Sequence, residues 1–164
     1  MRETIQHPFP PLYDGNSRIL ILGSFPSVKS REQRFFYGHP QNRFWRVMAG
    51  VLGCETPKDI PEKREMLLRN AIALWDSIGR CEIEGSSDAS IGQVIPNDLT
   101  PIFSAADIRQ VFCNGKKSWE MYHQYIEPAC GHPAVCLPST SPANAAWSLE
   151  RLTLAWESAL RPYL

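Results

Sequence analysis

Four short apolar runs recur along the chain, and each is followed by polar or small residues. They occupy residues 19–22, 71–75, 110–113 and 134–137. None of them alternates strictly between apolar and polar positions, which is typical of strands that are buried on both faces. The runs therefore predict four strands of one sheet.

The segments between these runs carry apolar residues at helical spacing. The predicted helices cover 41–52 and roughly 60–70, begin near 97–98 and after 114–115, and include a last one that stops before Pro162. Strands that alternate with helices indicate parallel β/α units, and right-handed crossovers place helices on both faces of the sheet. The sequence thus predicts an α/β fold: a three-layer α/β/α sandwich with a central four-stranded parallel sheet.

Three segments show neither pattern. Residues 1–16 are predicted to be an irregular lead-in, 24–40 a long loop with room for one helical turn, and 79–97 a polar loop. A loop as long as 24–40 in a compact domain is usually functional. Because no internal repeat, linker or low-complexity segment is present, residues 1–164 are expected to form a single domain.

Charge and cysteine content narrow the class of protein. The 17 Lys and Arg residues balance the 17 Asp and Glu residues, so no global basic field points to nucleic acid. The 5 cysteines include no C-x-x-C pair, and the histidines lack ligand spacing, so we predict no disulfide framework and no metal. No stretch approaches the roughly 20 apolar residues of a membrane helix, and no signal-peptide centre is present. We expect a cytoplasmic monomer without a membrane partner.

Basic residues nevertheless gather in one stretch, opposed only by Glu32. They are Lys29, Arg31, Arg34, Arg43 and Arg46. A solvated face explains a charge run of this kind without any ligand. This run, however, lies within the long loop and the helix after it, which favours a functional interpretation.

Polar groups suited to a ligand follow three of the predicted strands. In an open α/β sheet, ligands bind beyond the carboxyl ends of the strands. Tyr37 offers a flat ring, Asn42 an amide and Asp76 a lone carboxylate, and the hydroxyls of 139–141 follow the last strand. An aromatic platform, neutral polar groups and a nearby basic loop suit a nucleobase or nucleotide.

Each of these residues also has a structural explanation. Asn42 is equally placed to cap the helix that follows it, and Asp76 to hydrogen-bond a turn. Tyr37 can pack in the core, the hydroxyls of 139–141 can serve local turns, and His39 before Pro40 is predicted to be structural rather than a base. The chain has no P-loop and no G-x-G-x-x-G, which are common nucleotide-binding motifs, and no G-x-S-x-G, which carries the nucleophile of many hydrolases.

Two longer motifs carry more information. The first reads GSFPS from Gly23 to Ser27 and continues as YGHPQNRFW from Tyr37 to Trp45, and the second reads LPSTSPANA over 137–145. They resemble motifs of the uracil-DNA glycosylase superfamily, and within it those of the hypoxanthine (deoxyinosine) DNA glycosylase family. The mismatch-specific uracil glycosylases share the H-P-x-N-R-F-W portion. The resemblance implies a three-layer α/β/α fold. It also implies a monofunctional enzyme that flips a deaminated base and hydrolyses its glycosidic bond without a metal or cofactor.

One departure from the superfamily is informative. Several of its families place a water-activating Asp or Asn third in the first motif, where this chain has Phe25, which cannot polarise water. The resemblance therefore assigns the catalytic role to Asn42, the Asn of H-P-x-N. Its amide could position the attacking water or stabilise the departing base, and because an amide is a poor base we expect modest activity.

The remaining site residues follow from the same resemblance. Asp76 matches the position of a base-reading Asn, Tyr37 matches a base-stacking aromatic, and 139–145 matches the loop that pinches the phosphate backbone and fills the vacated stack. The residues expected to contact the substrate are Ser24, Phe25, Pro26, Ser27, Tyr37, Asp76, Ser139, Thr140, Ser141 and Asn144. Those expected to contact the DNA backbone are Lys29, Arg31, Arg34 and Lys116.

We therefore predict a base-excision repair glycosylase that acts on hypoxanthine, uracil or both in DNA with deaminated bases. A non-catalytic DNA- or nucleotide-binding module on the same scaffold is the main alternative. A third hypothesis is an unrelated small-molecule hydrolase that uses Ser24 or Ser139.

Overall fold

A parallel sheet forms the centre of the molecule in the computed structural model, which describes residues 2–164. Its 4 strands have the order β3-β2-β6-β7. They are β2 (Ile19–Gly23), β3 (Ile72–Asp76), β6 (Gln110–Asn114) and β7 (Ala134–Leu137). Every residue of β2 and β3 is buried, as expected for strands covered on both faces. The predicted parallel sheet is confirmed.

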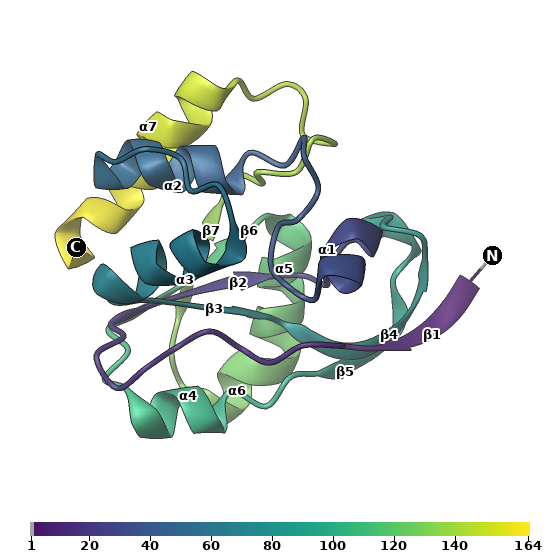
Figure 1. Cartoon of the computed structure of the whole chain (residues 1–164). Helices are drawn as coiled ribbons and strands as arrows, with labels where there is room; N and C mark the ends of the chain where they lie inside the picture. Colours follow the sequence, from purple (N-terminus) through teal and green to yellow (C-terminus); the bar gives the residue numbers. More distant parts are fainter. Residues whose placement is uncertain (1) are drawn as a thin grey trace.

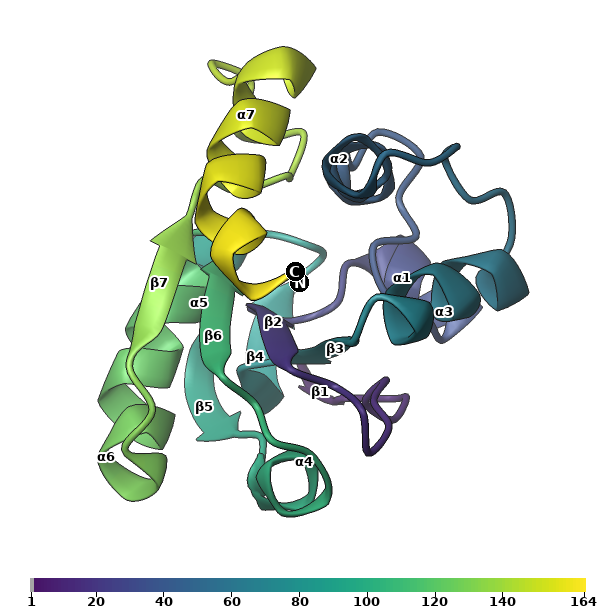
Figure 2. The same cartoon turned by 90° about the vertical axis from the view of Figure 1, so that its left-hand side faces the viewer.

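Helices cover both faces of this sheet (Figures 1 and 2). One face carries α2 (Phe44–Leu52), α3 (Ile60–Arg69) and α7 (Leu149–Leu160). The other carries α4 (Thr100–Ala105), α5 (Lys116–Met121) and α6 (Glu127–Cys130), with a π-helical segment, Tyr122–Ile126, between the last two. The three-layer α/β/α arrangement is therefore confirmed.

Local chemistry explains where several helices begin. Asp59 caps α3, accepting a hydrogen bond from the Glu62 backbone N–H at 2.9 Å. α2 begins at Phe44 and not at residue 41 as predicted, because Asn42 Oδ1 accepts the Phe44 N–H at 2.9 Å and ends the preceding turn. On α7, Leu152 and Trp156 are fully buried one turn apart and hold this helix to the core.

A second sheet corrects two of the sequence predictions. The expected lead-in, 1–16, and the expected loop, 79–97, instead supply an antiparallel sheet of order β1-β4-β5. Its strands are β1 (Arg2–Gln6), β4 (Ile78–Glu84) and β5 (Gly92–Pro96). The first residue of the lead-in lies outside the described residues. The signal of β1 was weak because this strand is mostly exposed. β4 does alternate between buried and more exposed residues from Gly79 onward, a pattern that the prediction of a polar loop overlooked.

The small sheet has its own apolar cluster, which reaches the first motif. Phe25 packs there with Ile78, Cys81, Ile83 and Met121. The turn between β4 and β5 is a 3₁₀ turn, Asp88–Ser90. This turn and α1 (Val28–Gln33), which lies within the predicted loop 24–40, stand beside each other at the same end of the molecule (Figure 1).

The motifs meet where the parallel strands end. Gly23 at the end of β2 pairs in register with Asp76 at the end of β3, and Asn114 on β6 pairs with Leu137 on β7. The segments that follow these strands therefore emerge at one edge of the sheet. β7 is the outer strand there, and its Cys136 is exposed although it lies in one of the four apolar runs.

Candidate active site

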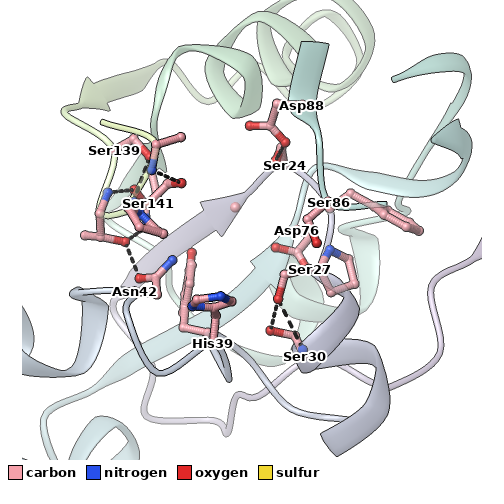
Figure 3. Close-up of a pocket in the computed structure, with 18 of the residues that line it drawn as sticks. Ser24, Ser27, Ser30, His39, Asn42, Asp76, Ser86, Asp88, Ser139 and Ser141 are labelled. Carbon is pink, nitrogen blue, oxygen red and sulfur yellow. Dashed lines mark hydrogen bonds between the residues drawn. The ribbon is translucent and has the colours of Figure 1, made fainter. Parts of the chain in front are cut away.

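A cavity of about 530 Å³ lies at this edge, between the two motifs (Figure 3). Nine of the ten predicted substrate-contacting residues line it, together with Asn42: Ser24, Phe25, Pro26, Ser27, Tyr37, Asp76, Ser139, Thr140 and Ser141. Asn144 does not line this cavity but lies on a neighbouring groove of about 570 Å³. Segments more than a hundred residues apart thus share one space, and its volume is typical of a small-molecule or cofactor site.

The amide of Asn42 has a fixed orientation. Its Oδ1 accepts two hydrogen bonds, from the Phe44 backbone N–H at 2.9 Å and from the Thr140 hydroxyl at 2.8 Å. Oδ1 is therefore engaged, whereas Nδ2 has no partner among residues 2–164 and belongs to a residue of the cavity wall. Asn42 can accordingly donate hydrogen bonds into the cavity. The N-cap position of α2 belongs to Arg43, so Asn42 supports the start of this helix from the preceding turn and does not cap it.

A buried relay behind Asn42 sets this orientation. Thr140 is fully buried, and its hydroxyl accepts a hydrogen bond from Asn114 Nδ2 at 3.0 Å while it donates to Asn42. Asn114 Oδ1 in turn accepts the Thr140 backbone N–H at 3.0 Å. The Thr140 hydroxyl is thus engaged by protein groups and positions the Asn42 amide.

Arg43 joins the two motifs directly. Its Nη2 donates to the carbonyl oxygens of Ser141 at 2.8 Å and Asn144 at 3.0 Å, and its Nη1 donates to that of Trp147. The Arg43 backbone N–H also donates to the Thr140 carbonyl at 3.1 Å. The arginine of the H-P-x-N-R sequence is therefore the group that shapes the second motif, through a fork of donors that a lysine does not provide.

Asp76 presents a carboxylate inside the cavity. The residue is 4% exposed, and its Oδ2 accepts a hydrogen bond from His7 Nε2 at 2.6 Å. Its Oδ1 stands close to Gly23: a Cβ at that position would clash with it and would lie 3.0 Å from the Tyr37 hydroxyl. Glycine is required there because the carboxylate occupies the space of a side chain.

Tyr37 stands next to this carboxylate in an unusual backbone conformation. Its φ is 52°, and its ring stacks on Phe44 with centroids 4.1 Å apart. The hydroxyl is buried without a hydrogen-bond partner among the described residues. Burial raises the Tyr37 pKa, and the nearby Asp76 charge adds to the shift, so the hydroxyl stays protonated. An unpaired O–H in the wall of a cavity is a donor that a bound ligand can satisfy.

A second carboxylate, Asp88, lies across the cavity on the turn of the small sheet (Figure 3). The Ser24 hydroxyl donates to its Oδ1 at 2.9 Å. Asp88 is exposed to solvent, although many protein atoms lie around its carboxylate. This partial loss of hydration raises the Asp88 pKa, while the Ser24 hydrogen bond and Lys117 oppose the shift.

The predicted DNA-backbone residues occupy different surroundings. Lys116 lines the neighbouring groove. Lys29 is exposed and lies 3.6 Å from Glu32, and Arg34 is exposed at the end of α1. Arg31 instead donates to the carbonyl oxygens of Pro26 at 2.8 Å and Gly85 at 3.2 Å, which ties the first motif to the small sheet.

Sequence reasoning missed three residues of this site. His7 lies in the supposed lead-in, Asp88 in the supposed loop, and Asn114 at the end of a strand, where it was considered only as the point before a helix begins. Asn114 could have been predicted from its position at the end of a buried strand, the same position that identified Asp76. His7 and Asp88 had no such signal, since the small sheet that positions them was not predicted.

Within 2–164, no group of three or more His, Cys, Asp or Glu side chains could hold a metal ion. No helix in the same range is long and apolar enough to cross a membrane. The cavity itself is lined by amide, hydroxyl, imidazole and carboxylate side chains.

Comparison with known proteins identifies the family. The model of the uracil DNA glycosylase superfamily matches residues 10–160. The hypoxanthine DNA glycosylase of Methanosarcina acetivorans is 34% identical over 160 residues, which cover 96% of this chain and 99% of that protein. That of Methanosarcina barkeri is 36% identical over 155 residues, 93% of this chain and 96% of that protein.

A solved structure agrees with this result. The solution NMR structure of a Methanosarcina acetivorans protein, described as a candidate uracil DNA glycosylase, has a TM-score of 0.81 and 34% sequence identity. The similarity covers 98% of each chain. The chain belongs to the uracil DNA glycosylase superfamily.

Proposed function

We propose that this protein is a monofunctional DNA glycosylase that hydrolyses the N-glycosidic bond of a flipped deaminated base, with hypoxanthine as its preferred base. One observation carries the proposal: a single cavity presents a donor, Asn42 Nδ2, and a buried acceptor, Asp76 Oδ1, to the same space. A deaminated base has the complementary groups, an acceptor carbonyl and a ring N–H. The names of the two Methanosarcina relatives support the same substrate.

The Asp76 carboxylate accounts for discrimination against adenine. An ionised carboxylate can only accept hydrogen bonds. Hypoxanthine offers its N1–H to such a group, whereas adenine presents the lone pair of an unprotonated N1. Leaving a buried charged group unpaired costs about 1–3 kcal/mol or more, which corresponds to a rate loss of roughly tenfold or greater.

The same carboxylate favours hypoxanthine over uracil. The N3–H of uracil lies between two carbonyl groups. A carboxylate that accepts this hydrogen therefore has an electron-rich oxygen of the base on each side of it. The N1–H of hypoxanthine has a carbonyl on one side and a C2–H on the other, which removes one of these repulsions. His7 holds Oδ2, so Oδ1 is the oxygen left to approach the base. Uracil is therefore proposed as the weaker substrate.

Guanine also carries an N1–H, so Asp76 alone does not reject it. We assign this discrimination to the duplex. Flipping costs least for a base that pairs poorly, and a guanine paired with cytosine is harder to extrude than a deaminated base. A guanine placed opposite a non-pairing position is the informative control.

Asn42 acts on the chemical step in this proposal. When the glycosidic bond breaks, its electron pair passes to the departing base, which becomes negatively charged. The free Nδ2–H of Asn42 can donate to an acceptor atom of that base, and a donor fixed in advance stabilises such charge more strongly in the transition state than in the ground state. The buried relay through Thr140 supplies this fixed orientation.

The test is an assay of purified protein on duplexes that each contain one deoxyinosine, one deoxyuridine or only normal bases. We expect abasic sites, revealed by alkaline cleavage, at deoxyinosine first and at deoxyuridine more slowly or not at all. A binding module would retard the duplex in a gel without leaving an abasic site. A small-molecule hydrolase would neither bind nor cleave it. Either outcome would overturn the proposal.

A further inference from the structure

Two cavities share one wall at the candidate site. The cavity described above and the neighbouring groove have four lining residues in common: Asp88, Ser139, Ser141 and Ala143. Of these four, only Asp88 carries an ionisable group. This carboxylate therefore stands at the junction of the two spaces.

If the protein is the proposed glycosylase, the bond between C1′ and the base lies at this junction. A flipped nucleotide places its base in the enclosed cavity and leaves its sugar and phosphates outside, where the strand continues. The groove that continues the cavity carries Lys116 and Asn144, groups suited to phosphates. The bond between C1′ and the base must then cross the boundary that Asp88 lines.

The other polar groups of the cavity are poorly suited to take a proton from water. Asn42 Oδ1 already accepts two hydrogen bonds. His39 Nδ1 accepts the Gln41 backbone N–H at 3.1 Å, so the neutral ring carries its proton on Nε2 and has no lone pair to spare. Asp76 uses Oδ2 for His7 and is assigned above to the base.

Asp88 keeps one carboxylate oxygen free. The Ser24 hydroxyl donates to Oδ1 and orients the group, and Oδ2 has no hydrogen-bond partner among residues 2–164. Ser24 belongs to the first motif, next to Phe25, whose apolar side chain cannot polarise water. A carboxylate held by this motif can replace the function that Phe25 lacks.

We infer that Asp88 is the general base of the reaction, with Ser24 as its positioning residue. The oxygen of a water molecule attacks C1′, and Asp88 Oδ2 accepts one of its protons. The C1′–N bond breaks and its electron pair leaves with the base, which Asn42 stabilises. The base then takes up a proton from solvent, and Asp88 returns its own proton to solvent, so that one water is consumed for each base released.

The raised pKa of Asp88 gives this inference a pH signature. A general base works only when it is ionised, so the rate should fall as the pH drops through the pKa of Asp88. Because that pKa is raised from 3.8, the fall should begin at a higher pH than for an ordinary aspartate. Asp76 and Lys117 are charged groups whose fields act on Asp88, and Lys116 lines the adjoining groove, so the pH profile is also measured for Asp76→Asn, Lys116→Gln and Lys117→Gln.

The experiment compares Asp88→Asn, Ser24→Ala and Glu82→Gln with the parent protein in single-turnover release of hypoxanthine. Glu82→Gln neutralises a carboxylate on the same hairpin outside both cavities and is the matched control. We expect Asp88→Asn to slow release by about 100-fold or more, Ser24→Ala by less, and Glu82→Gln not at all. Asp88→Asn should lose the part of the acid limb that belongs to Asp88 and keep any part that belongs to Asp76, while its affinity for uncleaved duplex and its melting temperature stay unchanged.

The possible failures can be told apart. If the parent protein releases no base, the proposed function fails. If the parent is active and Asp88→Asn retains its rate and its acid limb, only the assignment of Asp88 is overturned. A large loss in Glu82→Gln would likewise overturn it, because the effect would then come from the charge of the hairpin and not from one proton acceptor.

Discussion

Replacing Asp76 is the most informative perturbation of the base-reading groups. In Asp76→Ala the ring N–H of hypoxanthine enters a buried cavity without an acceptor, and His7 Nε2 loses its partner. A hydrogen bond to a charged group contributes about 1.5–3 kcal/mol, so the single-turnover rate should fall by roughly 10- to 160-fold. The loss should be smaller on deoxyuridine, because the second carbonyl beside the uracil N3–H already weakens the hydrogen bond to this carboxylate.

Asp76→Asn separates the acceptor from the charge. Its amide can point an oxygen at the base only if His7 changes tautomer and accepts a hydrogen bond from the new amide nitrogen. Otherwise the amide nitrogen faces the base and opposes the N1–H. We therefore expect an activity between those of the parent and Asp76→Ala.

The assay measures abasic sites at deoxyinosine under single-turnover conditions, so that product release does not mask the chemical step. Asp107→Ala removes an exposed carboxylate far from the cavity lining and serves as the control. If Asp76→Ala cleaves deoxyinosine as fast as the parent, Asp76 is only structural. Base choice would then have to come from backbone groups of the first motif.

Three further predictions concern the site and its basic surroundings. Asn42→Ala should lower base release by at least tenfold in single-turnover assays and keep the affinity for duplex, since it removes a donor that acts in the transition state. Unchanged cleavage would leave Asn42 with only a structural role at the start of α2. Gly23→Ala should push the Asp76 carboxylate out of place and cost activity with little loss of folding, and a fully active variant would show that this carboxylate does not need its position. Neutralising Lys29 and Lys116 together should weaken duplex binding equally for all sequences. The slope of log binding constant against log salt concentration should fall by roughly one for each phosphate that the protein no longer neutralises. An unchanged slope would place both lysines on a solvated surface.

The sequence was a good guide to the central sheet for a physical reason. Strands buried on both faces must be continuously apolar, so runs such as 19–22 and 71–75 are visible without any tertiary information. Asp76 followed directly, because the residue after a buried strand lies at the edge where ligands bind. The strand β7 was predicted as well, although its position at the edge of the sheet left Cys136 exposed.

The small sheet could not be predicted in this way. β1 has an exposed pattern with one half-buried residue, Ile5, and is held by backbone pairing to β4, far along the chain. His7 reaches Asp76 only because β1 delivers it there, 69 residues away in sequence. Asp88 sits in a serine-rich turn whose position depends on the same sheet. These contacts are non-local, and no local pattern encodes them.

The most direct measurement is the identity of the product. Purified protein is incubated with a duplex that contains one deoxyinosine, and the released base is analysed by liquid chromatography and mass spectrometry beside a matched reaction with Asn42→Ala. We predict free hypoxanthine in an amount equal to the abasic sites formed, and little or none with the variant. A duplex that stays intact, or hypoxanthine released equally well by Asn42→Ala, would contradict the assignment of this cavity as the active site.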